Sequence, residues 1–116
     1  MRESRPQFLQ GIHPFEGLGM DKPFLVDPEL TYVVPEGWET QAVYFRAGNS
    51  SDELVTVVLL RDGVPMRLFP VGAKESVHVS LRIVEDLLSG TRLEVHLAAP
   101  ATVNGWLVLD LGLMEV

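Results

Sequence analysis

The 116-residue chain contains no cysteine and no cluster of basic residues. Without cysteine it has no disulfide bond, no thiol nucleophile and no thiolate metal ligand, which fits the reducing cytoplasm where we expect the protein to be. Nine Lys and Arg against sixteen Asp and Glu give a formal net charge of −7. Phosphate backbones and anionic membrane surfaces repel such a chain, so we expect neither nucleic acid nor a membrane as its partner.

Long apolar runs and catalytic motifs are also missing. No run approaches the roughly 20 apolar residues of a membrane-spanning helix, and the opening MRESRPQFLQG lacks the apolar core of a signal peptide. GLGM at 17–20 has neither the preceding strand nor the following helix of a phosphate-binding loop. No Ser, His and Asp share a catalytic context, and nothing singles out two of the sixteen acids as a glycosidase pair. We therefore expect a protein that is not an enzyme and carries no cofactor.

The sequence from residue 30 onward instead indicates short β-strands separated by turns. Apolar residues alternate with polar ones in several segments, and 54–60 is apolar on both faces, as in a strand covered on both sides. Asp62-Gly63 supplies the positive φ angles of a tight hairpin. We predict an all-β fold, a single antiparallel β-sandwich of about seven strands over residues 30–116, with a closed sheet as the alternative. The expected strands are 30–34, 40–46, 54–60, 64–69, 76–83, 91–98 and 106–116.

One short segment has a family resemblance. LLSGTRLEVHLAA at 87–99 resembles the fibronectin type III consensus, in which a Leu and a Pro-Gly-Thr turn introduce an alternating strand. Ser89 stands where that consensus has proline, and Leu93 stands where it has tyrosine. The resemblance includes no functional motif, so it implies no site residue in this chain.

The first 29 residues combine residues that break regular structure with large apolar ones. Residues 1–37 hold four of the ten glycines and five of the eight prolines, which disfavours helix and strand. Disordered linkers, however, are depleted in large apolar residues. We therefore predict that residues 1–29 are an irregular, extended docking arm whose apolar side chains lie on another surface. The residues expected to make these contacts are Phe8, Leu9, Ile12, Phe15, Leu18, Met20, Phe24 and Leu25.

Three surfaces could receive this arm: the chain's own sandwich, an identical subunit, or a different protein. The remaining strands already supply enough residues for a core, so we favour association over a need within the protomer. The function that follows is a non-catalytic protein–protein interaction subunit, an accessory or structural component of a larger assembly. Its partner would be another protein or a second copy of the chain.

The alternative function is a small-ligand or carbohydrate-binding β-sandwich module. Trp38 follows a Pro-Glu-Gly turn, so we expect it to be the more exposed tryptophan and able to stack on a sugar ring. His78 and His96 fall on the polar sides of their strands, beside Glu75 and Glu94. Two imidazoles and a carboxylate could hold a metal if the strands paired. Neither strand carries a second histidine, however, so we expect no metal site.

Overall fold

The computed structural model describes residues 2–81 and 85–116. Within these residues the chain forms ten β-strands and one short 3-10 helix, η1 (Pro28–Leu30). This part of the chain contains no helix with the length and apolar character needed to cross a membrane. The strands are β1 (Arg5–Glu16), β2 (Gly19–Leu25), β3 (Thr31–Val33), β4 (Thr40–Asn49), β5 (Val55–Arg61), β6 (Val64–Val71), β7 (Ser76–Ser80), β8 (Asp86–Leu87), β9 (Arg92–Ala99) and β10 (Asn104–Glu115).

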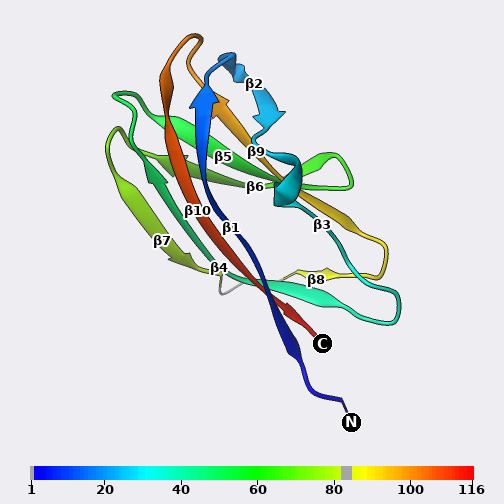
Figure 1. The fold of residues 1–116 in the computed structure, drawn as a ribbon. Coiled ribbons are helices and arrows are strands. Elements are labelled where there is room, and N and C mark those ends of the chain that lie inside the picture. Colours follow the sequence, from blue (N-terminus) through cyan, green and yellow to red (C-terminus); the bar gives the residue numbers. More distant parts are fainter. Residues whose placement is uncertain (1, 82–84) are drawn as a thin grey trace.

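The strands form two antiparallel sheets that pack face to face (Figure 1). Sheet A has the order β1-β10-β4-β7, and β8 also pairs with β4. Sheet B has the order β2-β9-β5-β6, and β3 also pairs with β9. The predicted antiparallel β-sandwich is confirmed, with more strands than the sequence indicated.

The core lies between the sheets and follows from the alternation of side chains along each strand. In β10 the four leucines at odd positions from Leu107 to Leu113 point inward and are at most 2% exposed. Across the interior, Phe45 of β4 stacks on Phe69 of β6, with ring centroids 3.9 Å apart. The inward faces of the two sheets therefore form one continuous apolar layer.

The central hairpin also matches its sequence. Asp62 and Gly63 join β5 to β6 with φ angles of 51° and 80°, the left-handed region that this turn requires. Pro65 lies in β6 at the edge of sheet B, where a residue without an N–H is tolerated. Strand β5 lies inside sheet B, and Val58 and Leu60 on its second face are also buried. The prediction of a strand covered on both faces is confirmed.

The prediction of an irregular N-terminal arm is wrong. Strand β1 pairs with β10 along its whole length, from Arg5 opposite Glu115 to Glu16 opposite Asn104. Figure 1 shows the two strands side by side. Strand β2 pairs with β9 in sheet B. The expected division into an arm, 1–29, and a sandwich, 30–116, is therefore not a boundary in the structure, because the first strand of each sheet lies within residues 1–29.

Two features of β1 hide its strand character from the sequence. It is an edge strand, with a hydrogen-bonded neighbour on one side only. Pro6 and Pro14, which have no N–H to donate, are therefore tolerated in it. Its polarity pattern is also reversed at several positions, because the buried set includes His13 while the exposed set includes Phe8 and Ile12. Strict alternation of apolar and polar residues, the usual mark of a half-buried strand, is therefore lost.

Candidate functional site

The eight arm residues expected to bind a partner divide into two groups. Some belong to the protein's own core: Leu9 and Phe15 are buried between the sheets, and Phe24 packs partly against them. Leu25 is also half-buried, in β2. The exposed members are Phe8, Ile12, Leu18 and Met20. Half of the predicted contact residues are therefore available to a partner, and they lie on a folded surface.

A row of exposed apolar side chains follows β1 and β10 on the outer face of sheet A. Ile12 lies directly opposite Val108 in the strand register, and these side chains are 64% and 48% exposed. Trp106, two residues from Val108 on the same face of β10, is 52% exposed, and so is Phe8 on β1. We call Phe8, Ile12, Trp106 and Val108 the β1–β10 stripe. The sequence indicated its β1 members, but not their position beside β10.

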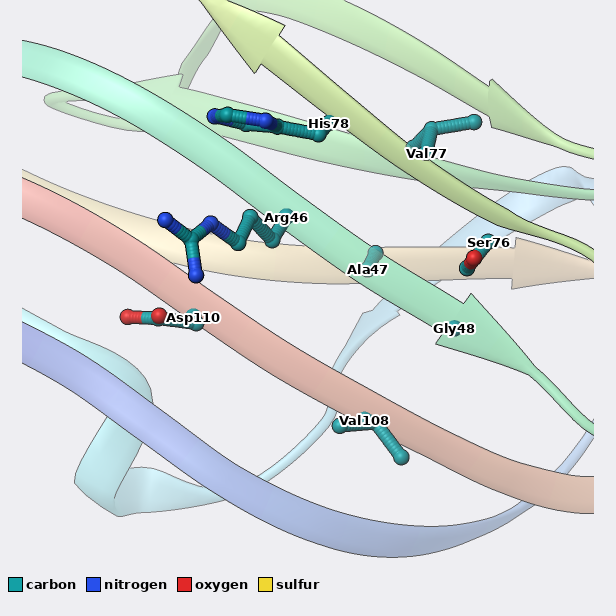
Figure 2. Close-up of a pocket in the computed structure, with 8 residues that line it drawn as sticks. All are labelled: Arg46, Ala47, Gly48, Ser76, Val77, His78, Val108 and Asp110. Atoms are coloured by element: carbon teal, nitrogen blue, oxygen red, sulfur yellow. The ribbon is translucent and has the colours of Figure 1, made fainter.

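An open groove adjoins the stripe on the same face of sheet A. Its volume is about 620 Å³. Gly48 of β4 lies opposite both Val108 of β10 and Ser76 of β7, and its lack of a side chain leaves the space above these strands open. A Cβ built at Gly48 would lie 3.6 Å from the Cβ of Val108, an ordinary contact. Figure 2 shows the lining residues, which are Arg46, Ala47, Gly48, Ser76, Val77, His78, Val108 and Asp110.

A row of polar residues crosses four of the five strands of sheet A beside this groove. The strand register places Gln10, Asp110, Arg46 and His78 in line, on β1, β10, β4 and β7. Gln10 Nε2 and the Tyr44 hydroxyl donate to Asp110 Oδ1, at 3.0 and 2.8 Å. The Arg46 guanidinium lies 5.0 Å from the centroid of the Tyr44 ring, and the His78 ring meets Tyr44 edge-on at 6.4 Å. Tyr44 therefore contacts three members of the row, Asp110, Arg46 and His78.

Burial raises the pKa of the Tyr44 phenol, and its hydrogen bond to Asp110 and the charge of that carboxylate raise it further. The positive charge of Arg46 acts in the opposite direction and lowers it. The net shift is upward, so the phenol stays neutral near pH 7 and remains a hydrogen-bond donor to the carboxylate. One oxygen of Asp110 is thus occupied by neutral donors.

Trp38 is covered by the N-terminus, contrary to the prediction that it is the more exposed tryptophan. The guanidinium carbons of Arg2 and Arg5 lie 3.7 and 3.8 Å from the centroid of its ring. Arg2 also donates a hydrogen bond to the backbone oxygen of Gly37. These contacts leave Trp38 half-buried, and Trp106 is the tryptophan that presents its ring on a sheet face. Pairing of β1 with β10 brings the two arginines to this turn, and local sequence does not reveal that pairing.

The two histidines proposed as ligand-binding residues lie on different sheets. His78 is exposed on β7 of sheet A and lines the groove. His96 is on β9 of sheet B, where its Nε2 lies 3.9 Å from Glu94 Oε1. The fold therefore does not bring them together. Over residues 2–81 and 85–116, no group of three or more His, Asp or Glu has the arrangement of a metal site.

A buried carboxylate at the opposite end of sheet A ties four strands together. Glu115 is 1% exposed and accepts hydrogen bonds from Arg5 Nε at 2.8 Å, from Gln7 Nε2 at 3.2 Å and from the Tyr32 hydroxyl. The Tyr32 oxygen is also 2.9 Å from Thr40 Oγ1. Glu115 continues the odd-numbered, inward-facing positions of β10, so its burial could have been predicted. Its partners could not.

The ionisation of this cluster follows from its contacts. Burial by itself raises the pKa of Glu115, but the hydrogen bonds from Tyr32, Gln7 and Arg5, with the charge of Arg5, outweigh it and hold that pKa below its usual value. Burial, followed by the hydrogen bond to Glu115, raises the pKa of Tyr32 to about 12. The cluster at neutral pH is therefore a carboxylate held by neutral and cationic donors, a structural role.

Comparisons with known proteins identify the fold and go no further. No family model and no curated protein matches the chain. The structure is similar to the crystal structure of PirA, with a TM-score of 0.51, 11% identity, and coverage of 96% of this chain and 94% of that one. It is also similar to the CBM36-1 domain of a multidomain xylanase from the hindgut metagenome of Trinervitermes trinervoides, with a TM-score of 0.50, 13% identity and 97% coverage of both chains. At these identities the similarity shows a shared β-sandwich fold.

Proposed function

We propose that this protein is a non-catalytic protein–protein interaction subunit, an accessory or structural component of a larger assembly, that docks its partner through the outer face of sheet A. The observation that carries the proposal is the β1–β10 stripe. Ile12, Val108 and Trp106 adjoin one another, and Phe8 lies on the same face beyond the Gln10–Asp110 pair. Exposed apolar side chains that gather on one face of a folded protein are typical of interaction surfaces. Tryptophan in particular is enriched among the residues that contribute most to protein binding. The partner is a different protein or a second copy of this chain.

The geometry of the stripe favours binding over simple exposure. Its residues stand on two strands whose pairing is continuous along β1, so little conformational freedom is lost when a partner covers them. Each large apolar side chain contributes about 1.5–3 kcal/mol when it is fully buried. We therefore assign to the outer face of sheet A the docking role that the sequence suggested for a separate arm. The partner then contacts the sandwich itself. We place the protein in the cytoplasm, in keeping with its lack of cysteine.

The second candidate function is a carbohydrate-binding module. The groove beside the stripe favours it, because polar side chains there surround an apolar floor on the face that also carries Trp106. The similarity to a domain of a xylanase agrees with such a role, although it concerns the fold.

The docking proposal is tested with a matched pair of variants. Ile12 and Leu68 are both 64% exposed and both lie on edge strands, in sheet A and in sheet B respectively. We expect the wild type and Leu68→Lys to retain the same partner on affinity capture from the native source, or to self-associate equally by light scattering, whereas Ile12→Lys does neither. Equal association of the two variants would overturn the proposal. So would a wild-type protein that is a 12.9 kDa monomer at all concentrations and captures no partner.

A further inference from the structure

The polar groups of the groove have bonding capacity that the described residues do not use. Asp110 Oδ1 accepts hydrogen bonds from both Gln10 and Tyr44, and Oδ2 accepts none from residues 2–81 and 85–116. Arg46 contacts the face of Tyr44 and forms no ion pair within the same residues, so its N–H groups remain open toward the groove. Figure 2 shows Arg46 reaching from β4 toward Asp110 on β10. One strong acceptor and one strong donor therefore stand side by side.

The charges of these two residues decide which class of ligand fits. A bound anion would meet the carboxylate of Asp110, and a bound cation would meet the guanidinium of Arg46. The two charges offset one another, so the groove favours a neutral ligand whose groups both donate and accept hydrogen bonds. Hydroxyl groups have this property.

The floor and the size of the groove further restrict the class of ligand that fits. Gly48 and the side chain of Val108 form an apolar surface on which the C–H face of a ring can lie. The volume of about 620 Å³ falls within the range of small-ligand sites. Trp106 is two residues, roughly 7 Å, along β10 from Val108 on the same face, within reach of an adjoining ring.

We infer that the groove binds a neutral saccharide. One sugar ring lies on Gly48 and Val108, its hydroxyls donate to Asp110 and accept from Arg46, and the next ring stacks on Trp106. The inference develops the second candidate function and does not depend on protein docking at the stripe.

The test is a titration of the full chain, followed by NMR, with neutral oligosaccharides of β-linked xylose, glucose and mannose, and with inorganic phosphate as the anionic probe. Gly48→Val fills the groove without forcing a close Cβ contact, and Arg46→Met removes the donors while keeping the aliphatic stem. Arg92→Met on sheet B is the control. Circular dichroism establishes that each variant is folded. If Gly48→Val does not fold, the saccharide-binding inference is judged on Arg46→Met alone.

We expect at least one oligosaccharide to shift the backbone signals of residues 46–48 and 108–110. The loss of a hydrogen bond to a charged group weakens binding by about tenfold or more, so Arg46→Met reduces affinity at least this much. Gly48→Val places a side chain where the sugar ring would lie and also reduces affinity, whereas Arg92→Met leaves it unchanged. Ile12→Lys, which disrupts protein docking, leaves sugar binding in place, so the two proposals fail independently. The inference is overturned if none of the three sugars binds, if binding survives both groove variants, or if phosphate binds in the groove instead.

Discussion

Substitution of two phenylalanines on β1 tests whether this strand belongs to the protein's own core. Phe15 is 6% exposed and points between the sheets, whereas Phe8 is 52% exposed on the outer face. Replacing a buried Phe by Ala removes its transfer free energy and leaves a cavity, which typically costs about 3–5 kcal/mol. An exposed substitution usually changes the free energy of unfolding by about 0.5 kcal/mol or less. We therefore expect Phe15→Ala to be destabilising by several kcal/mol and Phe8→Ala to be nearly neutral.

The assay is urea unfolding of the isolated protein, followed by circular dichroism at one protein concentration. A domain of this size is stable by about 5–15 kcal/mol, so Phe15→Ala lowers the unfolding midpoint strongly and lies near the limit of folding. Phe8→Ala unfolds close to the wild type. Equal midpoints for the two variants would refute the assignment of β1 to the sandwich, and they would restore the arm as a separate segment.

Three further predictions concern the other features of the structure. A Cβ at Gly112 would lie 2.0 Å from the ring of Tyr44, so Gly112→Ala displaces this ring and destabilises the fold by about 1–3 kcal/mol in thermal unfolding; an unchanged midpoint would contradict that ring position. Glu115→Gln lowers the free energy of unfolding by about 1–3 kcal/mol near pH 7. Because the folded-state pKa of Glu115 is lowered from 4.5, its stabilisation is present above about pH 4.5 and is lost as the pH falls through the folded-state pKa; a difference between variant and wild type that stays constant down to acid pH would refute this. In fluorescence quenching by acrylamide, Trp106→Phe removes the quenchable emission and Trp38→Phe retains it, and the reverse result would contradict the exposures assigned to the two rings.

The β-sandwich could be predicted from the sequence where a strand has one apolar face and a recognisable turn. The alternate leucines from Leu107 to Leu113 identify a strand whose inner face is buried, and the structure has them there. Asp62-Gly63 identifies its hairpin because few other residue pairs adopt two positive φ angles at low cost. Both signals are local, so they do not depend on which strands are neighbours.

The N-terminal strands and the candidate site could not be predicted, because they depend on pairing between distant parts of the chain. Prolines in β1 and β2 argue against strands unless those strands are known to lie at sheet edges. The polar row joins residues as far apart as Gln10 and Asp110, and only the strand register aligns them. The burial of Trp38 could not be predicted for the same reason, since Arg2 and Arg5 are distant from it in sequence and the pairing of β1 with β10 brings them to its ring.

Site-specific photo-cross-linking tests the proposed docking face most directly. A photoreactive phenylalanine analogue replaces Ile12 in one protein and Leu68 in the other, two positions of equal exposure on opposite sheets. Illumination in the native extract attaches covalently whatever protein lies against each position. The docking proposal predicts a discrete cross-linked product, with a partner protein or a second copy of the chain, from position 12 and none from position 68. No product from position 12, or the same product from both positions, would contradict it.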